Sequence, residues 1–519
     1  MRSTITFLGH AGLDVRLGAT RVVCDPWLSA RGAYLGSWHP FPDNGHLAAK
    51  DLHNTPTLFV SSPRPDHCDL ETLGAFPKTV RVVIPAFPSR VLADQIGQLG
   101  FTEVVELLDW QPLDLGGGAR LTVVSASPRH ILAAALVLEL DGEVIVNQND
   151  CPLDAATLAR LGATKPSVHF VQFSGASYFP AVYDFPPDQM KAHVEEEVAE
   201  ISRRFFGAAA EIGARYLVPS GGPPCFLDDR GFELNFDGSI FFDTDELQAR
   251  MGTATATATA TSTATEAPAL LERLRILYPG DAAVGEGGAW QFDGRKPYTD
   301  KRPYLEAYRS ARGPSRENQL AELRALALPV DLKELRSYLR DLFQFEDMTW
   351  DLGIMIQIRL TDGPSVWVDF RKKPFRYLTE CEEPANYVLT LESAWMSLIL
   401  QQKVTWHDLL MGLKVVVHRD PDRASPRLMS HFDYRHDAVL FDLVRQLDPA
   451  LITIQDEQME YVCQRFCPHR GRDLEYAIIE RGVLTCTAHG WRFDLRKGGK
   501  CLWGGDAPLL VKEIRPLKG

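Results

Sequence analysis

The strongest constraint on this chain is a pair of cysteine–histidine motifs near its C-terminus. One motif reads Cys467-Pro468-His469, and the second, after sixteen intervening residues, reads Cys486-Thr487-Ala488-His489. Two thiolates suit one iron of a two-iron cluster, and two neutral imidazoles suit the other. A small β-fold can hold such a cluster between two loops. A zinc site is the alternative, although zinc fingers normally pair their two histidines with each other. The spacing therefore favours an iron–sulfur cluster bound by Cys467, His469, Cys486 and His489.

The residues that flank both motifs point the same way. Arg470-Gly471-Arg472-Asp473-Leu474 follows the first motif, and Gly490-Trp491-Arg492-Phe493 follows the second. These stretches resemble the Rieske domains of ring-hydroxylating and related oxygenases. The resemblance implies an all-β domain, which we place at residues 436–519, with a [2Fe-2S] cluster of raised potential. It also implies electron donors, namely a ferredoxin, an NAD(P)H-dependent reductase, or both.

Composition limits the other partners. The length of 519 residues suggests about three or four domains, and 45% hydrophobic with 24% charged residues is ordinary for a globular protein. The formal charge of -13 gives no basic surface for nucleic acid. No apolar run of membrane-spanning length and no signal peptide appear, and the cysteines outside the motifs are scattered. We therefore expect a cytoplasmic protein that binds neither nucleic acid nor membrane.

The N-terminal part has the pattern of a layered α/β domain. Residues 4–26 alternate apolar and polar side chains around a turn at Gly18, which predicts a β-hairpin. Polar loops carrying histidines and aspartates follow several further strands. The later elements that we expect are strands at 57–62, 120–124 and 215–219, a hairpin through Asp141-Gly142, and a long amphipathic helix at 187–212. We assign residues 1–250 to this domain.

The middle of the chain begins with an alternating Thr-Ala run at 253–265, which cannot bury much surface. We expect a disordered low-complexity loop at 251–268 and an α+β region at 269–435. Within that region, residues 270–328 and 331–343 look helical, and residues 354–358 and 366–368 form a hairpin.

Two N-terminal stretches carry a second resemblance. Ile5-Thr6-Phe7-Leu8-Gly9-His10-Ala11-Gly12-Leu13-Asp14 and Cys24-Asp25-Pro26-Trp27-Leu28 resemble the opening of the metallo-β-lactamase fold. Together with residues 174–180, 406–410 and 419–432, they are similar to the CMP-N-acetylneuraminate hydroxylase family. The resemblance implies an αββα metallo-β-lactamase-like sandwich with an α+β extension, followed by the Rieske domain. That family carries its Rieske domain first, so the two modules are in swapped order here.

The metal motif of this superfamily is altered. Its H-x-H-x-D-H pattern corresponds to Ser62, Arg64, Asp66 and His67, so the first two histidines are replaced. By the same resemblance, His130 matches a lone histidine ligand, Asp150 matches the bridging aspartate, and Ser220 replaces the last histidine. Imidazole and carboxylate together suit a mononuclear Fe(II). The expected catalytic residues are Asp66, His67 and Asp150, with His130 as a further metal ligand.

Two more residues could contact the substrate. Arg64 would place a fixed positive charge where one metal normally sits, and it could instead hold a substrate carboxylate or phosphate. His10, at the end of the first predicted strand, could orient a ligand carboxylate, although a packed histidine is the commoner outcome there. A pocket that has lost its metal and survives as a scaffold is the alternative for the whole site.

These features favour one function over two others. A Rieske cluster beside a metal site indicates a non-haem iron oxygenase that hydroxylates a C–H or N–H bond of a small polar metabolite, such as an amino-sugar or nucleotide-linked substrate. The alternative is an electron-transfer or redox-sensing protein with a decayed metal site. A hydrolase is disfavoured because the dinuclear pair cannot form. A homo-oligomer is expected by analogy with Rieske oxygenases.

Overall fold

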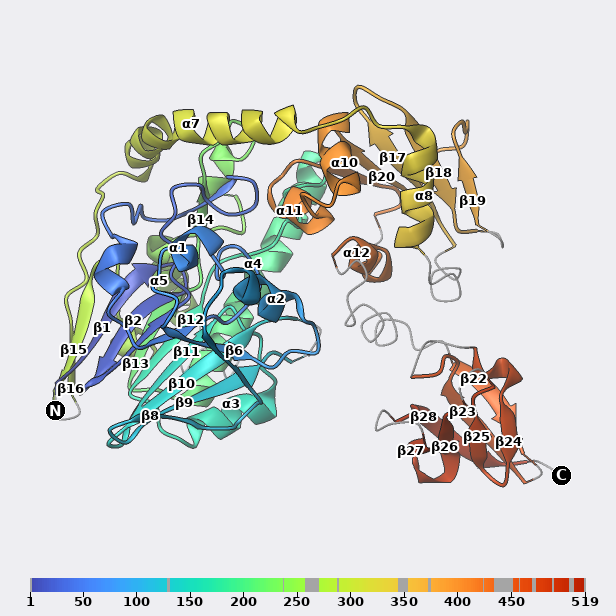
Figure 1. Ribbon diagram of the computed structural model, residues 1–519, viewed down its shortest axis with the longest axis horizontal. Helices are drawn as coiled ribbons and strands as arrows, with labels where there is room; N and C mark the ends of the chain where they lie inside the picture. Colours follow the sequence, from blue (N-terminus) through green and yellow to red (C-terminus); the bar gives the residue numbers. More distant parts are fainter. Residues whose placement is uncertain are drawn as a thin grey trace. The chain divides into compact units, whose positions relative to one another are not determined.

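Residues of the chain fall into two compact units in the computed structural model (Figure 1). The structure describes residues 2–127, 131–236, 238–256, 270–286, 289–343, 353–371, 375–422, 424–433, 451–456, 458–468, 473–487, 490–503 and 508–517. The first unit contains Met1–Ala327 and Asp408–Val415, and the second contains Leu328–His407 and Val416–Gly519.

The first unit is built on two large β-sheets. One has eight strands in the order β16-β15-β1-β2-β3-β5-β6-β7, and the other has six in the order β13-β12-β11-β10-β9-β8. The strands of the first sheet are β1 (Arg2–Gly9), β2 (Gly12–Leu17), β3 (Thr20–Cys24), β5 (Thr57–Phe59), β6 (Arg81–Pro85), β7 (Glu103–Leu107), β15 (Ala282–Glu286) and β16 (Ala289–Phe292). Those of the second are β8 (Leu113–Gly116), β9 (Ala119–Ser125), β10 (Ala134–Leu140), β11 (Glu143–Asn149), β12 (Val168–Gln172) and β13 (Tyr216–Ser220).

The two sheets face each other across one apolar core. Ile5 and Val22 from the first sheet share a buried cluster with Leu121, Leu138 and Phe170 from the second. This alternation of inward apolar residues is what sheet-on-sheet packing requires. The predicted hairpins through Gly18 and through Asp141-Gly142 form between β2 and β3 and between β10 and β11.

Helices cover the outer face of each sheet. Leu73 of α1 (Leu70–Gly74) and Ile96 of α2 (Val91–Gln98) pack on Leu58 in the first sheet. Leu161 of α3 (Ala155–Gly162) and residues of α4 (Pro187–Ile212) pack on the second sheet. The layers are therefore helix, sheet, sheet, helix, which confirms the αββα sandwich (Figure 1).

Further helices and a small sheet belong to this unit. The helices include α5 (Thr244–Ala256), α7 (Lys301–Ala325), the C-terminal part of α11 (Trp406–Met411) and the 3-10 helices η1 (Ala49–Leu52) and η2 (Phe232–Asn235). The small sheet pairs β4 (Trp38–Pro40) with β14 (Pro224–Phe226). Helix α5 includes the first residues of the Thr-Ala run, so the expectation of a loop is wrong there. The rest of that run, residues 257–269, lies outside the described residues.

The expectation of helix throughout 270–328 is also wrong. β15 pairs antiparallel with β1, and β16 extends the same sheet beyond it. The physical reason is the exposed edge of β1, whose backbone groups need partners. A short helical turn at residues 270–273 and the long helix α7 are the helical parts of the stretch.

The second unit begins with an α+β part. Its sheet has the order β19-β18-β17-β20-β21, and the predicted hairpin forms between β17 and β18. The elements are α8 (Leu332–Leu342), β17 (Met355–Leu360), β18 (Ser365–Asp369), β19 (Arg376–Leu378), β20 (Tyr387–Leu391), α10 (Ser393–Leu400), β21 (Val416–Arg419) and α12 (Pro426–Asp433).

The C-terminal part is all β in its described residues, apart from short 3-10 turns. One sheet contains β22 (Leu451–Gln455), β23 (Met459–Gln464) and β28 (Val511–Pro516), and the other contains β24 (Ile478–Glu480), β25 (Val483–Thr485), β26 (Arg492–Asp494) and β27 (Lys500–Trp503). Tyr461 and Phe493 lie in one buried cluster that draws on both sheets. Across the described residues, no helix is long and apolar enough to span a membrane.

Candidate metal centre

Residues that follow the C-terminal ends of several strands meet in the first unit. His10 follows β1, Asp25 follows β3, the 60–67 loop follows β5, and Asp150 follows β11. Three of the residues at these strand ends, His10, Asp25 and Asn149, have left-handed backbone conformations, with φ of 51°, 38° and 44°. Such conformations are uncommon outside glycine and gather at functional sites. They turn the chain sharply as it leaves each strand.

The centre of this region is a cluster of two imidazoles and one carboxylate. His10, Asp66 and His67 are fully buried, and each offers one ligand atom within 4.8 Å of the other two. His10 Nε2 lies 3.1 Å from Asp66 Oδ2, and His67 Nε2 lies 3.6 Å from the same oxygen. Two histidines and one carboxylate form the donor set of non-haem Fe(II) sites with open positions.

His67 is oriented from its other ring nitrogen. Its Nδ1 lies 3.0 Å from Asp25 Oδ2 and 3.2 Å from Ser61 Oγ. Ser61 in turn donates from its backbone N–H to Asp25 Oδ1 at 2.8 Å and from its hydroxyl to Oδ2 at 2.5 Å. A carboxylate behind a ligand histidine fixes the ring and leaves Nε2 for the metal. Asp25 therefore supports His67 in the way that metal sites require.

Asp150 lies beside this cluster, with Arg64 next to it. One carboxylate oxygen of Asp150 forms an ion pair with the Arg64 guanidinium, and the other lies 3.4 Å from His67 Nε2. Burial raises the pKa of Asp150, but the charges of Arg64 and His67 outweigh it and hold that pKa well below the usual range. The same ion pair raises the pKa of Arg64 against the effect of burial. Asp150 is therefore ionised and faces the cluster.

Tyr34 and Asp25 are site residues that sequence reasoning did not single out. The buried Tyr34 hydroxyl donates to Asp66 Oδ1 at 2.8 Å. Burial, followed by the negative charge of Asp66, raises the pKa of Tyr34 well above its usual value, so the phenol stays a donor. For Asp25, the only sequence signal of a role in the site is that it lies in the 24–28 stretch, which resembles the metallo-β-lactamase fold. Tyr34 comes from a loop without a recognisable motif.

The electrostatics and the unpartnered atoms test whether a metal fits. His67 Nε2 and Asp150 Oδ1, which lie 3.4 Å apart on the side of the cluster, are buried without hydrogen-bond partners. Burial lowers the pKa of His67, but Asp150 and Asp66 raise it to about 10. Burial likewise raises the pKa of Asp66, and His67 and His10 more than reverse this effect. Unpaired buried polar atoms are costly, and a cation among them would satisfy them. The donor set and these atoms therefore fit a metal ion.

The structure brings most of the predicted site residues together. Asp66 and His67 lie in one cluster, and Asp150 lies 3.4 Å from His67. His10, which the sequence suggests as a substrate contact, is a third potential metal ligand in the same cluster. Ser220, in place of a histidine, is fully buried with its hydroxyl unpartnered. His130 lies outside the described residues.

The second predicted centre is in the C-terminal part. Cys467 and Cys486 are buried in the same core cluster, and neither forms a disulfide. Gly490 N donates to Cys486 O, and Cys486 N donates to Trp491 O, so Cys486 lies next to Gly490 and Trp491. His469 and His489 lie outside the described residues. Two buried thiols in one small core suit the cysteine half of the cluster.

Comparison with known proteins assigns the class of this C-terminal part. Residues 436–510 match the family model of the Rieske [2Fe-2S] domain, which implies a [2Fe-2S] cluster. The chain therefore contains a Rieske domain joined to an αββα metallo-β-lactamase-like sandwich. It is similar over nearly its whole length to a protein named Rieske 2Fe-2S iron-sulfur protein in Mycobacterium tuberculosis strain H37Rv. The two are 28% identical over 96% of this chain and 97% of that protein.

Two other comparisons cover less. Cytidine monophosphate-N-acetylneuraminic acid hydroxylase of Cricetulus griseus is 30% identical over 28% of this chain and 27% of that protein. A solved metallo-beta-lactamase fold protein of Bacillus subtilis is 13% identical, covers 55% of this chain and 99% of its own, and has a TM-score of 0.33. The assignment of the first unit as an αββα sandwich therefore follows from its own layers and strand order.

Proposed function

We propose that this protein is a Rieske-dependent non-haem iron oxygenase that hydroxylates a C–H or N–H bond of a small polar metabolite. The observation that carries the proposal is the buried cluster of His10, Asp66 and His67 in the same chain as a Rieske domain. A Rieske cluster transfers single electrons and does not itself activate dioxygen, so a second iron is the simplest reason to join it to a metal-binding fold.

In this proposal His10, Asp66 and His67 hold the iron, with Asp150 as an additional ligand when it leaves Arg64. The bound iron would supply the activation of dioxygen. The chain's own residues prepare the site: Asp25 orients His67, and the Tyr34 hydroxyl holds Asp66. Arg64, whose side chain is 23% exposed, offers a positive charge that could bind an anionic substrate group.

The partial similarity to cytidine monophosphate-N-acetylneuraminic acid hydroxylase supports an amino-sugar or nucleotide-linked substrate. The Rieske domain supports an NAD(P)H-dependent reductase, with or without a ferredoxin, as electron donor. A homo-oligomer in the cytoplasm is part of the same proposal.

One observation favours the alternative of an electron-transfer or redox-sensing protein. Arg64 forms an ion pair with Asp150, so one of the predicted ligands has a cation of the chain itself as its partner. In this alternative the charge of Arg64 takes the place of the metal ion, and the sandwich is a ligand-binding module without iron.

An iron count separates the two functions. The protein is reconstituted with excess Fe(II), and iron is measured beside the visible spectrum of the cluster. More than two irons per chain, with the excess lost in Asp66→Ala while the cluster spectrum persists, supports the oxygenase. Glu211→Ala, an exposed change on α4, is the matched control and keeps all iron. Two irons per chain in the unmodified protein would leave the electron-transfer protein as the function.

The reaction itself is tested by reducing the reconstituted protein without oxygen, admitting air with candidate substrates, and measuring product masses. A gain of one oxygen atom that requires both the reduced cluster and Asp66 supports the proposal.

A further inference from the structure

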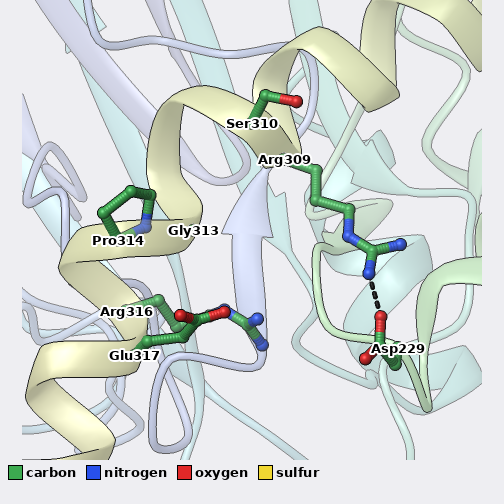
Figure 2. Close-up of a pocket in the computed structure, with 7 residues that line it drawn as sticks. All are labelled: Asp229, Arg309, Ser310, Gly313, Pro314, Arg316 and Glu317. Carbon is green, nitrogen blue, oxygen red and sulfur yellow. Dashed lines mark hydrogen bonds and ion pairs between the residues drawn. The ribbon is translucent and has the colours of Figure 1, made fainter.

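A second polar site lies in the first unit, along the side of α7. A cleft of about 280 Å³ opens there, with Arg309, Ser310 and Arg316 from the helix and Asp229 from the loop after β14 in its lining. Figure 2 shows these side chains on either side of the opening, with the ion pair between Arg309 and Asp229 at one edge. The residues of the candidate metal centre are absent from this lining.

Arg316 is the buried cation of this cleft. Its side chain is only 10% exposed, and its Nε has no hydrogen-bond partner. The nearest carboxylate is Asp228, whose Oδ2 lies 3.7 Å from Arg316 Nη1. Charge-assisted hydrogen bonds are normally about 2.7–2.9 Å long. Arg316 is therefore largely buried, with one long ion pair to Asp228 and an Nε that has no hydrogen-bond partner.

A second buried cation draws on the same carboxylate. Lys414, 14% exposed, lies 3.5 Å from Asp228 Oδ2. One carboxylate thus serves two largely buried cations, and both distances are longer than a close charge-assisted hydrogen bond. Removing a charge from water is unfavourable unless a counter-charge is present, so this arrangement favours an added anion.

His39 lies in the same charged region. It is buried, and burial lowers its pKa to about 4, against a backbone hydrogen bond to Gly36; the charges of Arg312 and Arg316 lower the pKa further, and Asp228 opposes them. The remaining ions near the cleft are already paired or exposed. Arg312 pairs with Asp43, Arg309 pairs with the exposed Asp229, and Glu317 is exposed at the rim, where solvent screens its charge.

We propose that the cleft beside α7 binds a small oxyanion of the phosphate class, either free phosphate or a phosphate monoester, with Arg316 as its buried partner. Ser310 and Arg309 lie at the opening and would contact the exposed side of the ligand. The volume is near the lower end for ligand pockets, about 300–1,000 Å³, so it suits phosphate or the phosphate end of a larger molecule. This site does not depend on the oxygenase function.

The test is calorimetric titration of the full-length protein, at constant ionic strength, with inorganic phosphate and separately with glycerol 3-phosphate. We expect saturable binding that weakens at least tenfold in Arg316→Gln and several-fold in Arg309→Gln. Arg302→Gln is the matched control, because Arg302 lies on the same helix but pairs with Glu233 outside the cleft. Circular dichroism checks that each variant is folded.

Three results would overturn the proposal: no saturable binding of either ligand, binding that is undiminished in folded Arg316→Gln, or binding that is lost in Asp66→Ala or Arg64→Gln. The last result would place the anion at the metal centre. If the monoester binds more tightly, the ligand is a phosphorylated metabolite; if the two bind equally, free phosphate is sufficient. Only two irons per chain in the unmodified protein, with phosphate binding retained, would defeat the oxygenase alone.

Discussion

At the scale of single residues, the candidate metal centre depends on polar groups that hold the ligands from behind. Asp25 and Ser61 fix the ring of His67, and Tyr34 fixes the carboxylate of Asp66. Such supporting contacts hold the ligand side chains in the orientation that the metal needs, and their loss typically lowers metal affinity by about 10–100-fold. The supporting groups are therefore the most informative residues to change.

We predict that Asp25→Asn lowers the affinity for Fe(II), or for Co(II) as a probe, by about 10–100-fold. The amide no longer provides the charged acceptor that holds His67 Nδ1. Metal titration followed by ultraviolet and visible spectroscopy measures the change. Ser61→Ala removes the hydroxyl behind Asp25 and should have a smaller effect. Equal metal affinity in Asp25→Asn and the unmodified protein would show that His67 does not ligate the metal.

A second residue-scale prediction concerns acid stability. His169 on β12 is fully buried, and its Nε2 lies 2.9 Å from Gln148 Oε1. Burial lowers the pKa of His169 to about 3. An unfolded histidine has a pKa near 6.5, so between these values only the unfolded state binds the proton. His169 should therefore lower the free energy of unfolding by about 1.4 kcal/mol for each pH unit below about 6.5.

Denaturant unfolding at pH 7.5, 6 and 5, followed by tryptophan fluorescence, measures this dependence. His169→Gln, if folded, should show a slope smaller by that amount. His418→Gln, at an exposed position on β21, is the control. An unchanged slope in His169→Gln would mean that His169 does not differ in protonation between the two states.

At the scale of elements, the turns of the Rieske part are shaped by close backbone approach. Gly498 and Gly499 stand just before β27, both with left-handed backbone, φ of 64° and 79°. A Cβ on Gly499 would collide with the backbone carbonyl of Leu509, whereas a Cβ on Gly498 would meet nothing within 4 Å. The backbones of Gly499 and Leu509 are also joined, because Leu509 N donates to Gly499 O at 2.8 Å.

We predict that Gly499→Ala destabilises the Rieske part far more than Gly498→Ala does. The Gly498 change adds only left-handed strain of about 1–2 kcal/mol, and the Gly499 change adds a backbone collision. The temperature at which the cluster absorbance is lost provides the measurement. Similar losses in the two variants would contradict the close approach of Leu509.

At the scale of the whole molecule, the two units have separate cores. The sandwich buries its own apolar clusters, and the C-terminal sheets bury another that includes both cluster cysteines. Each unit therefore has the apolar burial that independent folding requires.

We predict that Cys467→Ser together with Cys486→Ser removes the [2Fe-2S] cluster but leaves the sandwich folded. Differential scanning calorimetry should lose or shift one transition and retain the other, and the additional iron should stay bound. Collapse of both transitions would show that the units fold as one.

Local pattern and motif spacing were enough to predict the Rieske module, the long helix at 187–212, several hairpins, and Asp66 and His67 as site residues, because these signals lie in residues close together in the chain. The remaining features depend on contacts between residues that are distant in sequence. β15 and β16 became strands because β1 offered an open edge, and His10 and Tyr34 reached Asp66 from loops distant in sequence. The pairing of Asp150 with Arg64, and of two buried cations with Asp228, likewise depends on which strand ends and loops the fold brings together.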